Sequence, residues 1–166
     1  GSDANNGLSA STAFQTLQFA VSKVRAGDTV LVLDGTYRGF DLRTAGTASL
    51  PIVFKAQGSN VIINTPAATN DGINVENANW VVIDGFKVNN QPRNGIRIVT
   101  SNNVIVRNNS CDRNFERGIF TGFTNDILIE NNICTNSIDE HGIYVSNSSD
   151  RAIIRNNVCH HNNACG

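Results

Sequence analysis

Residues 95–117 read GIRIVTSNNVIVRNNSCDRNFER, and residues 118–141 read GIFTGFTNDILIENNICTNSIDEH. Both stretches open on Gly-Ile and contain an Asn-Asn pair, at 108–109 and at 131–132. The Gly-Ile opening occurs four times, at Gly72, Gly95, Gly118 and Gly142, with steps of 23, 23 and 24 residues. A repeat of this length predicts a solenoid of stacked coils, because each short unit must bury its apolar side chains against the next one.

Three short apolar stretches in each repeat predict three β-strands per coil. The first stretch follows the Gly-Ile opening. The second stretches are Val81–Asp84, Val104–Arg107, Ile127–Glu130 and Ala152–Arg155, and the third are centred on Val88, Cys111, Cys134 and Cys159. Because 23–24 residues leave no room for a crossover helix, we expect an all-β parallel β-helix whose strands pair with their equivalents about 4.8 Å away in the next coil.

Alternation of side chains along each strand assigns them to an inner and an outer face. The expected inward columns are Ile73/Ile96/Ile119/Ile143, Val81/Val104/Ile127/Ala152, Ile83/Val106/Ile129/Ile154 and Val88/Cys111/Cys134/Cys159. The residues Asn109, Asn132 and Asn157 fall at the corner after the second strand. We expect each amide to bond its own turn and the same amide one coil along, which is a structural role.

The chain contains four cysteines. We expect Cys111, Cys134 and Cys159 to be reduced thiols stacked in the core. A disulfide between neighbouring coils is the alternative, because an even number of cysteines in a secreted chain permits one. Cys165 falls outside this column and is available to pair with a cysteine of a further coil.

Residues 1–166 are expected to form a single β-helix domain in three parts. Residues 1–27 form an N-terminal cap with a helix over 11–25, started by Ser11 or Thr12 and closed by Gly27. Residues 28–70 form irregular first coils, and residues 71–166 form four regular coils. The sequence stops where another coil should start, so we expect a longer helix or a second chain to cover that end.

Two outward columns of the second strand concern stability and partners. The charged column is Asp84, Arg107, Glu130 and Arg155, which alternates in sign, and the apolar column is Val82, Ile105, Leu128 and Ile153. An exposed apolar stripe is usually covered. We expect either a further C-terminal segment or self-association at this stripe.

The overall composition narrows the classes of partner. The formal net charge of -1 argues against a nucleic-acid partner. No uninterrupted apolar run is long enough to span a membrane.

Several stretches together resemble the pectin-lyase-like family of right-handed β-helix proteins. They are Gly1–Asp3, Ala13–Leu17, Gly27–Val32 and Gly35–Tyr37, followed by the Gly-Ile and Asn-Asn coils. The resemblance covers nearly the whole chain. It implies a right-handed solenoid and a polysaccharide lyase or hydrolase, although a fold by itself does not confer an activity.

The resemblance also implies a substrate groove along the outer face of the first strand and the loop before it. The outward positions there are Asn74, Arg97, Phe120 and Tyr144, and Arg93 lies in a preceding loop. Arginines bind carboxylates through paired hydrogen bonds, and aromatic rings accept sugar faces. Arg93, Arg97, Phe120 and Tyr144 are therefore the candidate substrate-binding residues. The alternative for the two aromatic residues is simple stacking between coils.

Proton transfer would fall to titratable residues in the same loops. Glu116 and Glu140 occupy equivalent positions one coil apart, next to Arg117 and His141. These four are the candidate catalytic residues. Two carboxylates so close could also hold a cation, so that Glu116, Asp139 and Glu140 are candidate calcium ligands. The alternative is a solvated acidic loop neutralised by Arg117 and Arg113. Calcium-dependent pectate lyases cluster several aspartates with a basic residue, and this chain departs from that pattern.

Two classes of function follow. The first is a secreted or cell-surface enzyme that acts on an acidic, uronate-containing polysaccharide by β-elimination or hydrolysis. The second is a non-catalytic glycan-binding or structural solenoid of a larger extracellular protein. The groove of arginines and aromatic residues favours the first class, and the scarcity of titratable residues favours the second.

Overall fold

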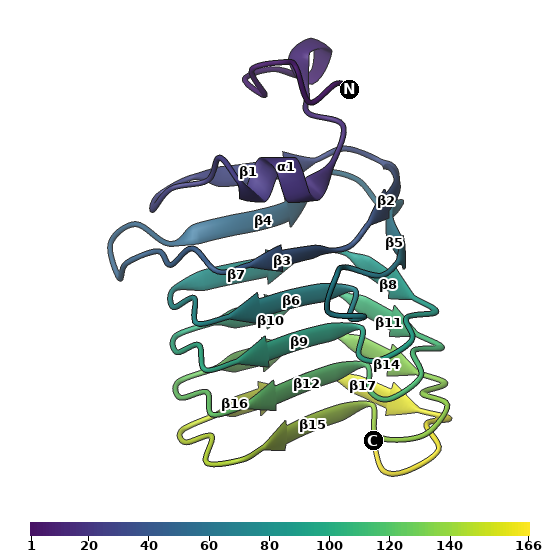
Figure 1. Cartoon of the computed structure of the whole chain (residues 1–166). Helices are drawn as coiled ribbons and strands as arrows, with labels where there is room; N and C mark the ends of the chain where they lie inside the picture. The colour runs from purple at the N-terminus through teal and green to yellow at the C-terminus, as the bar shows by residue number, and fades with distance from the viewer.

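Three parallel sheets form the walls of the molecule in the computed structural model, which describes residues 1–166. The chain passes once through each sheet per coil, and every strand pairs in parallel with its equivalent in the next coil. The result is a right-handed parallel β-helix of about six coils (Figure 1). The predicted fold class is confirmed.

The strands are short. Sheet A contains β1 (Thr29–Val32), β4 (Ile52–Ala56), β7 (Val81–Asp84), β10 (Ile105–Arg107), β13 (Leu128–Glu130) and β16 (Ile153–Arg155). Sheet B contains β2 (Gly35–Arg38), β5 (Val61–Thr65), β8 (Lys87–Asn89), β11 (Ser110–Asp112), β14 (Ile133–Thr135) and β17 (Val158–His160). Sheet C contains β3 (Phe40–Leu42), β6 (Ile73–Glu76), β9 (Ile96–Val99), β12 (Ile119–Gly122) and β15 (Ile143–Ser146).

Columns of like side chains fill the core. Ile73, Ile96, Ile119 and Ile143 are neighbours in the register of sheet C, and the first three are fully buried. Aromatic residues fill the first coils, where the rings of Phe40 and Phe54 stack with their centroids 4.6 Å apart. This one continuous core of 26 buried side chains stabilises the stack through apolar burial.

The Asn-Asn pairs 108–109, 131–132 and 156–157 build the corner between sheets A and B. The first asparagine of each pair, such as Asn131 (φ 55°), adopts the left-handed conformation that asparagine tolerates. The second asparagine lies inside the corner. Asn109 donates from Nδ2 to Asn132 Oδ1 at 3.0 Å, and Asn132 donates in the same way to Asn157 at 3.0 Å. The turn and the contact between coils therefore depend on the same pair.

The three stacked cysteines are free thiols. Cys111, Cys134 and Cys159 are partners in the register of sheet B, and the first two are buried. The hydrogen bond with the Cys111 thiol, together with burial, raises the pKa of Cys134 well above its usual value, although Cys159 opposes this. The column therefore packs as an apolar part of the core.

The predicted helix over residues 11–25 is wrong in its bounds. The segment contains a 3₁₀ turn, Ala10–Thr12, and one short helix, α1 (Leu17–Val21), whose N-cap is Thr16. The cause is Asp3, whose carboxylate accepts hydrogen bonds from the backbone N–H groups of Gln15 and Thr16 and from the Thr16 hydroxyl. α1 buries Leu17 and Val21 over the first coil (Figure 1).

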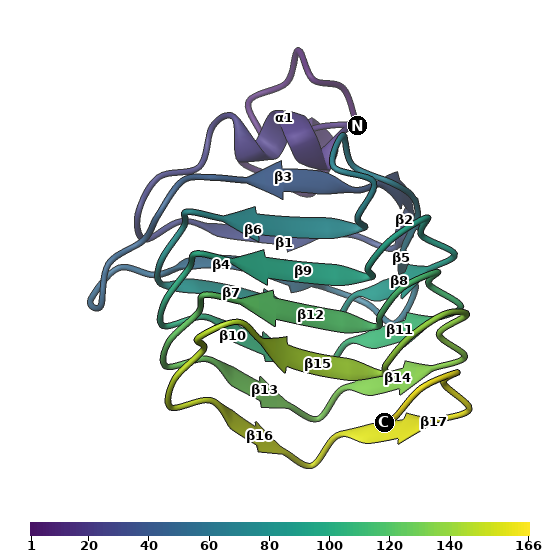
Figure 2. The same ribbon diagram turned by 60° about the horizontal axis from the view of Figure 1, so that its bottom comes forward.

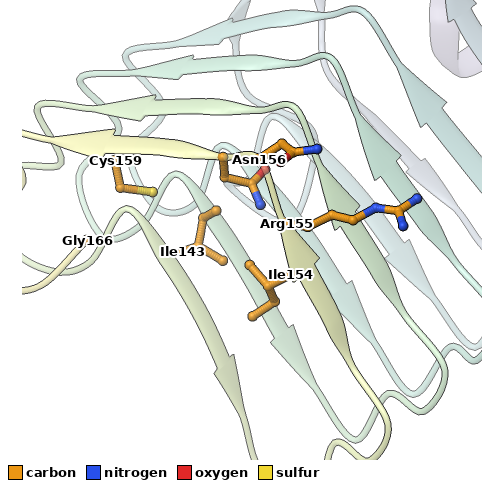
Figure 3. Close-up of a pocket in the computed structure, with 7 residues that line it drawn as sticks. Ile143, Ile154, Arg155, Asn156, Cys159 and Gly166 are labelled. Carbon is orange, nitrogen blue, oxygen red and sulfur yellow. The ribbon is translucent and has the colours of Figure 1, made fainter.

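The last coil leaves its inner side chains open. A cavity of about 300 Å³ lies there, lined in part by Ile143, Ile154 and Cys159. Figure 3 shows Ile143 and Ile154 pointing toward each other, whereas Arg155 points away from them. Ile154 has the inward orientation of its column, yet it is 51% exposed.

The structure contains no membrane-spanning helix.

Candidate functional site

The outer face of sheet C and the loops before its strands form the candidate site. Figure 2 shows this face, with β3, β6, β9, β12 and β15 stacked in order. Asn74, Arg97, Phe120 and Tyr144 are successive partners in the register and form one outward column. The repeat spacing placed these four residues correctly relative to one another.

A second column lies in the loops just before these strands, at the residues that directly precede the repeated glycines. Its members are Asp71, Asn94, Arg117 and His141. The glycines are needed because a Cβ at Gly95 would lie 2.6 Å from the carbonyl oxygen of Gly118, and a Cβ at Gly118 would lie 2.6 Å from that of Gly142. This close stacking of the loops sets the polar side chains side by side.

Arg117 is the centre of the site. Its guanidinium contacts Glu116 Oε2 at 3.0 Å and Glu140 Oε2 at 2.5 Å. The same group lies over the rings of Phe120 and Tyr144, at 4.9 and 5.2 Å from their centroids. Only 14% of the side chain is exposed. Arg117 therefore holds two carboxylates and two aromatic rings in fixed positions.

The aromatic side chains of this face continue into the loop before β15, which contains His141. The rings of Phe120 and Tyr144 are tilted, with centroids 6.1 Å apart, and His141 stacks on Tyr144 at 4.9 Å. The Cys165 N–H donates to His141 Nδ1 at 3.2 Å. In the neutral form the ring therefore carries its hydrogen on Nε2, so that this nitrogen is a donor and not a base.

Arg93 is the more accessible of the two candidate binding arginines. Its side chain is 43% exposed, and its Nε donates to Glu116 Oε1 at 3.3 Å. Its Nη1 lies 3.9 Å from Oδ2 of Asp71, a fully buried carboxylate oxygen that accepts no hydrogen bond. Burial raises the pKa of Asp71, and the hydrogen bonds from Asn94 and the charge of Arg93 only partly oppose this.

Arg97 is held within the sheet. It donates to Asn74 Oδ1 at 2.7 Å and to Glu76 Oε2 at 3.2 Å, and only 18% of its side chain is exposed. Glu76 also pairs with Arg43 at 3.0 Å. Partial burial raises the pKa of Glu76, but Asn74 and the two arginines outweigh it, and the pKa lies below its usual value. Arg97 is thus less available to a ligand than Arg93.

The candidate calcium ligands do not converge. Arg117 bridges Glu116 and Glu140, and Asp139 is exposed and in no ion pair. No three His, Cys, Asp or Glu side chains are placed to hold one metal ion. The pairing with Arg117 matches the alternative in which the loop is neutralised by arginine, whereas Arg113 pairs instead with Asp112 at 2.9 Å.

Sequence reasoning missed Asp71, Glu76 and Arg43. Asp71 had an available signal, because it shares the position before glycine with Arg117 and His141. Glu76 and Arg43 gave no such signal, because their contacts depend on where long side chains extend across coils.

Comparison with known proteins gives the same fold. An alginate lyase from Paenibacillus sp. str. FPU-7 superposes with a TM-score of 0.70 at 25% identity, over 85% of this chain and 54% of the lyase. The pectate lyase Pel9A superposes with a TM-score of 0.72 at 17% identity, over 86% of this chain and 41% of Pel9A. A rhamnogalacturonan lyase superposes with a TM-score of 0.54 at 20% identity, over 91% and 41% of the two chains.

This chain therefore spans 54% of the alginate lyase and 41% of each of the other two. No curated protein sequence matches it. A family model described as the Pel9A-like, right handed beta helix region matches residues 1–141. The chain belongs to this Pel9A-like family of right-handed β-helix proteins.

Proposed function

We propose that this chain binds an acidic, uronate-containing polysaccharide along the outer face of sheet C and cleaves it, by β-elimination or hydrolysis. The observation that carries the proposal is the position of Arg117, which joins two carboxylates to two aromatic rings on one exposed face. The similarity to alginate, pectate and rhamnogalacturonan lyases supports it. Such an enzyme would act outside the cell, where these polymers occur.

In this proposal Arg93 binds a uronate carboxylate, because its guanidinium is the more accessible of the two binding arginines. Tyr144 and Phe120 support the sugar rings. Arg97 positions Asn74 and Glu76 at the edge of the same face.

In β-elimination a base removes the proton next to the uronate carboxylate, the electron pair forms a carbon–carbon double bond, and the glycosidic oxygen leaves with a proton. Glu140 and Glu116 are the available bases, and Arg117 orients both. His141 donates a hydrogen bond from Nε2 to the glycosidic oxygen, because its Nδ1 already accepts the Cys165 N–H, and solvent water supplies the proton that leaves with this oxygen.

One observation favours the second candidate, a non-catalytic glycan-binding solenoid. Glu116 and Glu140 are each paired with an arginine, so both carboxylates are already engaged by a cation of the protein itself. A surface of this kind can bind sugars without turning them over.

The experiment mixes the protein with pectate, alginate and rhamnogalacturonan, with and without calcium, and follows the ultraviolet absorbance of the unsaturated uronate together with the release of reducing ends. Loss of turnover in Glu140→Gln and His141→Ala with binding intact would support the enzyme. The matched control is Glu130→Gln, which removes an arginine-paired glutamate from sheet A. Binding without any turnover in the wild-type chain would leave the glycan-binding module.

A further inference from the structure

Two adjacent histidines lie where β17 of sheet B ends, on a different wall from the candidate site (Figure 2). The Nδ1 atoms of His160 and His161 are 2.5 Å apart, and the ring centroids are 4.7 Å apart with 83° between the ring planes. Both side chains are exposed. Two ring nitrogens therefore face each other at one point of the surface.

This convergence departs from a regular strand, in which adjacent side chains point to opposite faces. The chain turns at His161, which has a φ of 56°, directly after β17 ends at His160. The same left-handed turn follows the three preceding strands of sheet B, at Asn90, Arg113 and Asn136. The turn is thus a property of four successive coils.

The equivalent residues of two other coils show how this turn directs adjacent side chains. After β14, Thr135 Oγ1 and Asn136 Nδ2 both donate to Oδ1 of Asp112, at 2.8 and 2.7 Å. After β11, Arg113 Nη1 lies 2.9 Å from Oδ2 of Asp112, its neighbour in the chain. The last residue of the strand and the residue after it thus bring their polar atoms together, and after β17 these two residues are imidazoles.

Two facing ring nitrogens can share either a proton or a metal ion. With a proton, one ring donates an N–H and the other accepts it. With a metal ion, both rings use a lone pair, and each nitrogen lies about 2.0–2.1 Å from the ion, which separates the two nitrogens by roughly 3 Å. Rings whose nitrogens are 2.5 Å apart need to open only slightly to admit the ion.

We propose that His160 and His161 chelate one divalent transition-metal ion through their Nδ1 atoms, with water in the remaining coordination positions. Imidazole nitrogen is a ligand for zinc, nickel and copper, whereas calcium and magnesium prefer oxygen. The arginine of the same column, Arg113, lies two coils away and is neutralised by Asp112, so it does not repel the ion.

One turn fixes both rings, so the second nitrogen binds the ion at a high effective concentration. Loss of either ring should therefore weaken binding about a hundredfold. The site is separate from sheet C, and the proposal does not depend on the function of that face. Calcium added with a polysaccharide should not occupy it.

Calorimetric titration of the chain with zinc and nickel salts tests the proposal. One equivalent should bind, and His160→Ala and His161→Ala should each show the hundredfold loss. The matched control is His141→Ala, which removes the third and last histidine of the chain and should bind the metal like the wild type. Cys165→Ser removes an exposed thiol, which is also a zinc ligand, and should bind equally well. Circular dichroism checks that all variants are folded.

Nitrogen-15 spectra of the imidazole side chains give a second readout. Zinc should shift the Nδ1 resonances of His160 and His161 and leave those of His141 unchanged. Three results overturn the proposal: no binding at roughly 1 mM metal, where even a millimolar site is half filled; binding that persists unchanged in either His160→Ala or His161→Ala; or binding that is lost in Cys165→Ser.

Discussion

The guanidinium of Arg117 lies over the ring of Phe120, with its carbon 4.9 Å from the ring centroid. Phe120 belongs to β12, which begins two residues after Arg117, so the Arg117 side chain lies over the strand that follows it in the chain. From there it reaches Glu140 in the next coil. One side chain thus couples two coils and orders the exposed face.

Replacing Arg117 with alanine should therefore destabilise the fold. The change leaves Glu116 and Glu140 facing each other without their common cation, and we expect a loss of about 2–3 kcal/mol in the free energy of unfolding. Chemical denaturation measures it. Arg117→Lys should recover only part of the loss, because one ammonium cannot form both branches of the contact.

The matched control is Arg151→Ala, which removes an exposed arginine paired with Asp126 at 2.7 Å. Exposed pairs contribute little to stability. Equal losses in the two variants would contradict the central position of Arg117.

Asp71 should make the protein less stable as the pH rises. Burial raises its pKa above the usual value of 3.8, so the folded chain holds this proton more tightly than the unfolded chain does. Stability is then lost as the pH rises from about 3.8 through the raised pKa. Asp71→Asn should be more stable than the wild type at neutral pH, and the difference should disappear in acid. Melting temperatures across this range measure it.

Glu76 provides a control of opposite sign. Its pKa lies below 4.5, because Asn74, Arg43 and Arg97 outweigh the effect of partial burial. Its contribution is present above pH 4.5 and is lost as the pH falls through the lowered pKa. Glu76→Gln should therefore be less stable than the wild type at neutral pH. A shift of the same sign in both variants would rule out the assignment for Asp71.

The fold was predictable because each coil repeats the same constraints. Stacking puts Ile96 on Ile119 and Asn109 beside Asn132, so the spacing alone determines the register. The N-terminal cap was not predictable in this way. The true start of its helix depends on Asp3, which lies 13 residues before the N-cap Thr16 and belongs to no repeat.

The sequence predicted which residues of the candidate site share a column, but it did not predict which charged side chains pair with one another. The period assigned Phe120 and Tyr144 to one column, and these residues are partners in the register of sheet C. It could not show that Arg117 would lie between Glu116 and Glu140. Long side chains have several rotamers, and which partner they choose depends on neighbours in other coils.

Asn132→Ala should cause one of the largest losses of stability in the chain. The buried Asn132 amide donates to the Val106 carbonyl at 2.9 Å and accepts from the Asn109 N–H at 3.0 Å. Truncation leaves these buried groups unpaired, which should cost about 2–4 kcal/mol. Denaturation measures it, with Asn163→Ala as the control. Asn163 also donates to a carbonyl, at 3.0 Å, but it is exposed, so water can replace it. Similar losses in both would show that burial is not the cause.

Tyr144→Ala should weaken polysaccharide binding about tenfold, if the outer face of sheet C is the binding surface. Tyr144 is 37% exposed, and its ring is held by His141 and by Arg117, so that it presents a fixed apolar face to a sugar. Tyr144→Phe should keep most of the affinity, because the ring remains.

Calorimetric titration with oligosaccharides of alginate and pectate measures the change, and Phe123→Ala is the matched control. Phe123 is also aromatic and is 57% exposed, but it lies in the turn after β12 and outside the column of Phe120 and Tyr144. An exposed ring by itself should not confer affinity, whereas a ring held beside Arg117 and His141 should. If Phe123→Ala weakened binding and Tyr144→Ala did not, the polysaccharide would have to lie along the turn, and the arginines of sheet C would have no part in its recognition.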